Sequence, residues 1–109
     1  MKQTSKTKND VLGIAKQYRG NYRSKYSVSS GSPGSYYWFL INENEVKLYT
    51  ADKTNKKRGE ATTYSDAWTI ENNLYIKNQK SCIGIFLDKN TAYMDGFKNI
   101  YYSEFIKVG

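Results

Sequence analysis

In the stretch AWTIENNLYI (residues 67–76), two short apolar runs, Ala67–Ile70 and Leu74–Ile76, flank the polar segment Glu71–Asn73. Apolar runs of this length, bounded by turn-forming residues, are typical of β-strands. Asparagine tolerates the positive φ angles that tight hairpin turns require. The stretch therefore predicts a β-hairpin, and its spacing is a guide to the rest of the chain.

The same pattern continues on both sides of this hairpin. From Asn21 the period changes to two: Tyr22, Ser24, Tyr26 and Val28 alternate with Arg23, Lys25 and Ser27, which predicts a strand with one buried and one solvated face. Similar runs recur about every 8–12 residues, at positions 22–28, 36–41, 46–50, 62–64, 67–70, 74–76, 82–87, 91–94 and 100–108. We therefore expect an all-β fold, an up-and-down antiparallel meander of eight or nine strands that closes into a small barrel.

The N-terminal part of the chain has a different character. Residues 1–9 are polar and lack apolar periodicity, so we expect a disordered tether before a single β-barrel domain over residues 10–109. Asp10 is a candidate helix cap, apolar side chains follow it at helical spacing, and Gly20 is a stop signal. These features predict one short helix over residues 10–19 that closes one end of the barrel.

The chain has eleven tyrosines and no histidine. Tyrosine favours strands and contact faces, whereas histidine is the side chain most used for proton transfer near neutral pH and for metal binding. Metal-ligand sets, phosphate-binding loops and paired catalytic carboxylates are not recognisable in the sequence. The composition therefore predicts a non-enzymatic binding domain with no catalytic residue, no cofactor and no metal.

The positive charge is concentrated near the N-terminus. The formal net charge is +7, yet residues 1–25 hold seven basic residues against Asp10 alone, so the remaining chain is nearly neutral. A nucleic-acid footprint would spread Lys and Arg along one face. We therefore expect no strong nucleic-acid binding, and we interpret the basic segment at residues 53–58 as a solvated turn.

Cys82 is the only cysteine, so an internal disulfide is excluded, and its apolar neighbours predict a buried, unreactive thiol. The sequence shows neither an apolar run of membrane-span length nor a signal peptide. We expect a cell-envelope or extracellular location if a signal has been removed, and a cytoplasmic one if Met1 is the native start. Membrane attachment would then require a lipid anchor outside this chain.

Two stretches carry a resemblance to a known family. Gly20-Asn21-Tyr22 opens the first expected strand directly after the helix, and Trp68–Ile76 forms an aromatic-turn-leucine hairpin. In this pattern the chain resembles the lipocalin-like (calycin) barrels of bacteria, including small lipoproteins. The resemblance implies a barrel that binds a small apolar ligand or a protein partner. The disulfide pairs of many secreted lipocalins are absent, and the chain is short for a large ligand cavity.

Aromatic side chains form the candidate ligand site. The densest cluster, Tyr36–Phe39, follows Ser29–Ser35, a segment rich in serine and glycine that predicts a flexible loop at the open end of the barrel. We therefore expect a ligand-binding pocket among the residues Tyr26, Tyr36, Trp38 and Trp68. The competing interpretation is a fully packed interior, because most strand aromatics serve as core.

Two other functions stay open at this point. Arg19, Arg23 and Lys25 interleave with tyrosines, as in an OB-like domain that binds single-stranded nucleic acid by base stacking. A small protein-interaction module of the inhibitor or immunity type would instead use its outer surface. An upstream lipobox cysteine would favour the cell-envelope binding domain over both.

Overall fold

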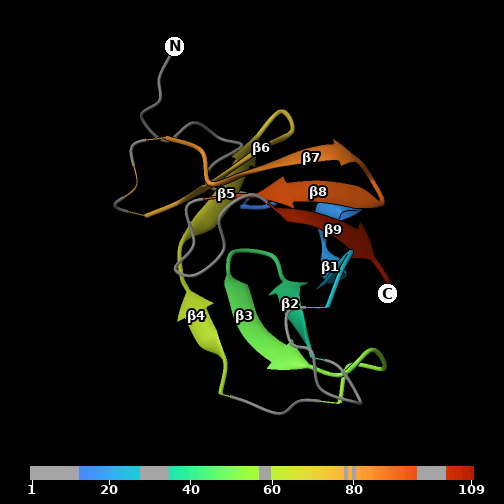
Figure 1. Cartoon of the computed structure of the whole chain (residues 1–109). Coiled ribbons are helices and arrows are strands. Elements are labelled where there is room, and N and C mark those ends of the chain that lie inside the picture. The colour runs from blue at the N-terminus through green and yellow to red at the C-terminus, as the bar shows by residue number, and fades with distance from the viewer. Residues whose placement is uncertain (1–12, 28–34, 57–59, 78, 80, 96–102) are drawn as a thin grey trace.

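A computed structural model describes residues 13–27, 35–56, 60–77, 79, 81–95 and 103–109. Over these residues the fold is all-β, with nine strands and a single turn of 3-10 helix, which confirms the predicted fold class (Figure 1). The elements are η1 (Lys16–Tyr18), β1 (Gly20–Ser24), β2 (Tyr36–Ile41), β3 (Val46–Ala51), β4 (Thr62–Tyr64), β5 (Ala67–Ile70), β6 (Asn73–Ile76), β7 (Gly84–Asp88), β8 (Thr91–Met94) and β9 (Ser103–Lys107).

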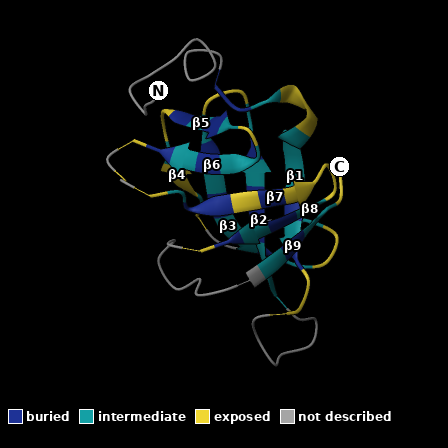
Figure 2. Cartoon of the chain, turned by 90° about the horizontal axis from the view of Figure 1, so that it is seen from above, coloured by how far each residue is buried: buried dark blue, intermediate teal, exposed yellow. Residues whose placement is uncertain are grey.

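All nine strands belong to one antiparallel sheet with the order β4-β3-β2-β1-β9-β8-β7-β6-β5. Consecutive strands pair within two runs, β1–β4 and β5–β9, and the runs join where β1 pairs with β9. The sheet curls into a nearly closed barrel whose edge strands are β4 and β5 (Figures 1 and 2). The predicted up-and-down meander is therefore confirmed, with its edges joined by a connection of two residues.

The segment Gly13–Ala15 fills part of the seam between the two edges of the sheet. The backbone N–H of Ile14 donates to the carbonyl oxygen of Glu43 at 2.7 Å. The backbone N–H of Thr69 donates to the carbonyl oxygen of Gly13 at 3.2 Å. The N–H of Ala15 donates to Thr69 Oγ1 at 3.0 Å. This segment thus links the β2–β3 turn to β5. It also pairs backbone hydrogen-bonding groups at the edge of the sheet that a neighbouring strand would otherwise pair.

The helix expected over residues 10–19 is much shorter in the structure. Its first three residues lie outside the described part, and the remainder forms only the 3-10 turn η1. Ala15, which precedes that turn, is extended, with a ψ angle of 139°. Gly13 has a φ angle of 80°, in the left-handed region. Hydrogen bonds to Glu43 and Thr69 therefore outweigh the local helical preference, and Ile14, not a helical face, enters the core.

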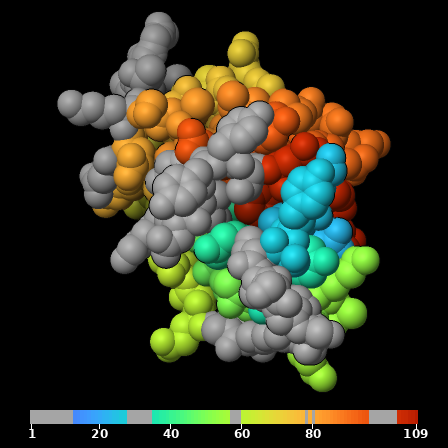
Figure 3. Space-filling view, viewed as in Figure 1, coloured from blue at the N-terminus to red at the C-terminus, as the bar shows by residue number. Residues whose placement is uncertain are grey.

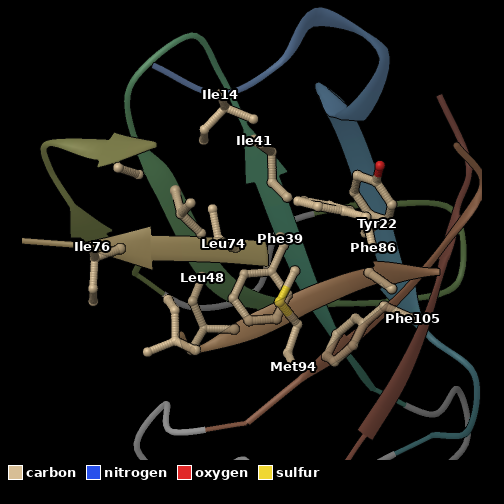
Figure 4. Close-up of a cluster of buried hydrophobic side chains, with 14 residues drawn as sticks. Ile14, Tyr22, Phe39, Ile41, Leu48, Leu74, Ile76, Phe86, Met94 and Phe105 are labelled. Atoms are coloured by element: carbon tan, nitrogen blue, oxygen red, sulfur yellow. The ribbon is translucent and has the colours of Figure 1, made fainter. Parts of the chain in front are cut away.

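Apolar side chains that alternate along the strands fill the inside of the barrel. Phe39 and Phe105 meet edge-on with ring centroids 4.8 Å apart, and Tyr18 stacks on Phe86 at 4.3 Å. Over the described residues, this packing agrees with the interpretation of a filled interior. The buried cluster comprises Ile14, Tyr22, Phe39, Ile41, Val46, Leu48, Ala67, Leu74, Ile76, Ile83, Phe86, Ala92, Met94 and Phe105 (Figure 4).

The β5–β6 hairpin forms as predicted, with Ala67 opposite Ile76. The positive φ angle of its turn, 56°, lies at Glu71 rather than at an asparagine. Asn72 exchanges two hydrogen bonds with Phe86: its side-chain amide donates to the carbonyl oxygen of Phe86 at 3.0 Å, and its own carbonyl oxygen accepts from the N–H of Phe86 at 2.8 Å. Attachment of the turn to β7 offsets the cost of a left-handed glutamate, about 1–2 kcal/mol.

Cys82 is half-buried rather than buried, so its predicted burial is wrong in degree. Cys82 precedes β7, and the neighbouring Ile83, which is 3% exposed, packs into the core instead. Low reactivity of the thiol stays a prediction.

Among the described residues, Tyr22 is the one tyrosine of the fully buried core. Its hydroxyl donates to the carbonyl oxygen of Tyr18 at 2.9 Å, and its side chain lies beside Phe86. Burial, together with the nearby Tyr18 and Asp88, raises the pKa of Tyr22 well above its usual value of 10.0. The group therefore stays neutral in the folded protein over the whole neutral and mildly alkaline range.

We expect this raised pKa to weaken the fold in alkali. Above pH 10 the unfolded chain releases the Tyr22 proton while the folded chain keeps it, so the free energy of unfolding falls as the pH rises. Tyr22→Phe should lose about 1 kcal/mol at pH 7 through the missing hydrogen bond, yet lose less stability than the wild type between pH 8 and pH 11. Urea unfolding at both pH values measures this difference, and Tyr26→Phe is the exposed control. Equal alkaline losses in wild type and Tyr22→Phe would contradict the assignment.

Candidate binding surface

The outer face of β1, β2 and β3 carries an unusual set of side chains for the outside of a barrel. Tyr22, Phe39 and Leu48 point into the core, so their neighbours along each strand point outward. The register places Arg23 beside Trp38 and Trp38 beside Tyr49. We define the β1–β3 outer face as Asn21, Arg23, Tyr36, Trp38, Leu40, Lys47 and Tyr49.

Trp38 is 1% exposed although it points away from the core. The turn that follows β3 covers it, and its indole Nε1 donates to the carbonyl oxygen of Asp52 at 3.0 Å. The Asp52 carboxylate in turn accepts from the N–H and hydroxyl of Thr54, at 2.9 and 2.7 Å, and from the N–H of Lys56 at 3.0 Å. Trp38 and Asp52 together therefore hold the 52–56 turn against the outer face.

Asn55 lies at the centre of that turn in a left-handed conformation, with a φ angle of 70°. The hydroxyl of Tyr49 donates to Asn55 Oδ1 at 2.6 Å. Burial raises the pKa of Tyr49, and the hydrogen bond to Asn55 partly opposes that rise. Within the described part of the chain, Asn55 Nδ2 has no acceptor, so this amide presents its N–H groups away from Tyr49.

Two adjoining hollows open on this face, and both are bordered by Asn21 and Asn55. In Figure 3, blue and cyan atoms from β1 and the residues just after it lie between the red C-terminal residues and the green ones. The smaller hollow, about 170 Å³, is lined by Asn21, Trp38, Lys53, Thr54, Asn55, Val108 and Gly109. The larger hollow, about 310 Å³, is lined by Asn21, Leu40, Lys47, Tyr49, Asn55 and Ala61.

Charged groups of both signs surround the hollows, because Glu45 lies beside Lys47 and Asp52 lies in the turn that carries Lys53. Each hollow has one lysine, Lys53 or Lys47, and among the described lining residues neither has an aspartate or glutamate side chain. Lys47 Nζ lies 3.7 Å from the Glu45 carboxylate, an exposed pair of small energetic value. Arg23 stands over the ring of Tyr36, with its guanidinium carbon 5.0 Å from the ring centroid.

Among the hollows described in the structure, none is lined by more than one of the four predicted site residues. Tyr36 and Trp38 lie on the β1–β3 outer face, and Trp38 borders the smaller hollow. Tyr26 is 73% exposed beyond the end of β1. Trp68 lies on β5 and stacks on Tyr75, with ring centroids 5.8 Å apart. As ligand contacts the four stay a prediction, but the structure separates Trp68 from the other three.

Other parts of the predicted site have mixed outcomes. The loop expected over Ser29–Ser35 lies outside the described residues except for Ser35, as do Lys57 and Arg58 of the basic segment. Lys53 and Lys56 are exposed, as the solvated-turn interpretation expects. The residues that sequence reasoning missed are Asn21, Leu40, Lys47, Tyr49 and Asn55. The only available signal was the Asp52-Lys53-Thr54 spacing, which is typical of a turn closed by an aspartate side chain.

The largest of the described hollows, about 460 Å³, is lined by the seam segment Gly13–Ala15 and its neighbours. Two basic side chains, Lys16 and Arg19, and two acidic ones, Glu43 and Glu71, line it. One of its lining residues is Gly13, the first residue that the structure describes. The β1–β3 outer face is the better defined site because hydrogen bonds hold Trp38, the 52–56 turn and the Oδ1 side of Asn55 in place.

Comparison with known proteins adds no family to this description. No family model matches the chain, and neither a curated protein nor a solved structure matches it. Over the described residues, no three His, Cys, Asp or Glu side chains are grouped to hold a metal ion. The same part of the chain contains no helix with the length and apolarity needed to cross a membrane.

Proposed function

We propose that the chain is a non-enzymatic binding domain that contacts its ligand with the β1–β3 outer face. The observation that carries this proposal is the contrast between the two sides of the sheet. Large side chains fill most of the inside of the barrel, where a hollow of about 230 Å³ remains at Tyr37, Leu48 and Tyr64, whereas two adjoining hollows with polar and apolar walls open on the outside. Concave sites with an apolar wall and a few placed polar groups are the usual form of ligand sites.

The titratable groups support binding rather than catalysis. The sequence has no histidine, and the two described groups whose pKa is shifted, Tyr22 and Tyr49, are both shifted upward, away from neutrality. General acid–base catalysis favours groups whose pKa lies near the working pH. The proposal includes a bacterial cell-envelope or secreted setting, which is supported by the resemblance to lipocalin-like barrels.

A fragment-mapping experiment tests which side of the sheet binds. We expect indole, phenol and cyclohexanol, each at millimolar concentration, to shift the backbone amide resonances of Asn21, Lys47 and Asn55 in ¹⁵N–¹H spectra. Resonances of interior residues such as Phe39 and Met94 should stay in place. Saturable shifts confined to the interior residues would show that ligands enter the barrel and would overturn the proposal.

A further inference from the structure

We propose that the hollow beside the seam segment binds a short peptide through its two charged ends, the α-ammonium group and the α-carboxylate. This hollow shares no lining residue with the two hollows of the β1–β3 outer face, so it is a second site, separate from that of the proposed function. Three features point to such a ligand: opposite charges that no ion pair joins, the fixed position of Arg19 and the engaged backbone of the seam segment.

The hollow presents opposite charges that do not neutralise one another directly. Lys16 and Arg19 line it together with Glu43 and Glu71. Within the described ranges, no ion pair joins either basic side chain to either acidic one. An anion that enters the hollow is repelled by the two glutamates, and a cation is repelled by the two basic side chains. Only a ligand that carries both signs gains from all four, so the lining favours a zwitterion.

The size of the hollow favours a peptide over a free amino acid. Its volume of about 460 Å³ lies within the range of about 300–1,000 Å³ that holds drug-sized ligands. The basic side chains come from η1 and the residue after it, whereas the acidic ones come from the β2–β3 and β5–β6 turns. An extended chain covers about 3.3–3.6 Å per residue, so the ends of a tripeptide lie about 10 Å apart and reach charges on separate elements.

Arg19 is held in position before a ligand arrives. Its Nε donates to the carbonyl oxygen of Ile14 at 2.9 Å, and Ile14 is fully buried in the core. The terminal N–H groups are therefore the donors left for a ligand, and a guanidinium group binds a carboxylate through paired hydrogen bonds. Because Arg19 is half-buried whereas Lys16 is exposed, Arg19 is the better anchor for the α-carboxylate. Glu71 lies in the turn that Asn72 attaches to β7, so its backbone is also fixed beside the hollow.

The seam segment leaves few backbone groups for a ligand. The N–H groups of Ile14 and Ala15 donate to Glu43 and Thr69. The carbonyl oxygens of residues 13, 14 and 15 are engaged as well. A peptide that added to this segment as a further strand, the usual way in which an extended chain binds a sheet edge, would find its hydrogen-bonding groups already taken. The ends of the peptide, and not its main chain or its sequence, are therefore what the hollow recognises.

The test compares five probes by NMR titration of the full chain at low salt. Trialanine carries both charges, N-acetyl-trialanine only the carboxylate, trialanine amide only the ammonium group, and N-acetyl-trialanine amide neither. Free alanine, the fifth probe, carries both charges on one carbon. We expect trialanine to give saturable shifts of the backbone amides of Ile14, Ala15 and Thr69, with a dissociation constant of about a millimolar. Alanine and each singly blocked peptide should bind about three- to five-fold more weakly, and the doubly blocked peptide at least about ten-fold more weakly.

Matched variants assign the two ends of the peptide. Arg19→Gln should weaken trialanine and N-acetyl-trialanine about five-fold and leave trialanine amide unchanged, because that probe has no carboxylate. Lys16→Gln, at an exposed position with little effect on packing, should weaken the same two probes about two- to three-fold. Glu71→Gln should instead weaken the two probes that carry the ammonium group, by about three-fold. Lys77→Gln is the charge control, because Lys77 pairs with Asp66 and does not line the hollow, and it should change each affinity less than about two-fold.

Three results would overturn the inference. They are equal binding of trialanine and its doubly blocked form, binding of alanine as tight as that of trialanine, and a loss of trialanine amide as large as that of N-acetyl-trialanine in both Arg19→Gln and Lys16→Gln. Shifts confined to Asn21, Lys47 and Asn55 would overturn it as well, because they would place the peptide on the β1–β3 outer face. In each case the fragment shifts on that face remain a separate test of the proposed function, since the two sites share no lining residue.

Discussion

Replacement of Phe86 by alanine is expected to lower the free energy of unfolding by about 3–5 kcal/mol. Phe86 is 1% exposed, stacks on Tyr18 with nearly parallel rings and also lies beside Tyr22 (Figure 4). Removal of its ring leaves a cavity between β7 and the η1 turn, which cannot collapse without moving both. A domain of this size has a total stability of about 5–15 kcal/mol, so the loss would be a large part of it.

The next residue in the chain is the matched control for this prediction. Leu87 is 50% exposed on the opposite side of β7, so Leu87→Ala should change the free energy of unfolding by less than about 0.5 kcal/mol. Urea unfolding followed by far-UV circular dichroism measures both variants, with an unchanged m-value as the sign that the unfolding reaction is the same. A loss below about 1 kcal/mol for Phe86→Ala would show that the ring is not a core element.

Gly13→Ala is expected to cost about 3 kcal/mol, although it adds a single methyl group. Gly13 has a φ angle of 80°, which is unfavourable for alanine, and an added Cβ would overlap the carbonyl oxygen of Glu43. That same oxygen accepts the hydrogen bond from Ile14. The substitution therefore displaces the seam segment from the β2–β3 turn and exposes Ile14, which is fully buried in the wild type.

A second glycine provides the control for the first. A Cβ at Gly109 would meet no atom within 4 Å, so Gly109→Ala should leave the stability unchanged. Amide hydrogen exchange gives an independent measurement: in Gly13→Ala the N–H groups of Ile14 and Thr69 should exchange much faster than in the wild type. Unchanged exchange at both positions would mean that the seam segment does not depend on Gly13.

The strands were predictable because their local signals agree with the final packing. The β5–β6 hairpin and the alternation of β1 are both set by neighbours in sequence, and short turns leave few ways to arrange nine strands. The run Tyr36–Ile41 shows the limit of this reasoning. It is apolar on both faces, so only the pairing of Tyr22 with Phe39 decides that Phe39 points inward and Trp38 outward.

The helix and the site depended on contacts that lie far apart in the sequence. The apolar spacing after Asp10 favours a helix, but hydrogen bonds with Glu43 and Thr69 hold the backbone of residues 13–15 in a non-helical form. The two hollows combine β1, β2, β3, the 52–56 turn and the C-terminal residues. In the sequence that turn is only a polar segment, and nothing local indicates that it folds back over Trp38.

The order of strands in the sheet also bears on how quickly the chain folds. Within each of the runs β1–β4 and β5–β9 the ladders join consecutive strands, which can form from local encounters. The ladder between β1 and β9 is different, since it pairs Tyr22 with Lys107 near opposite ends of the domain. Closing so long a loop costs entropy before any contact repays it. We therefore expect pairing of β1 with β9 to limit the rate of folding, with a folding time of about milliseconds to seconds.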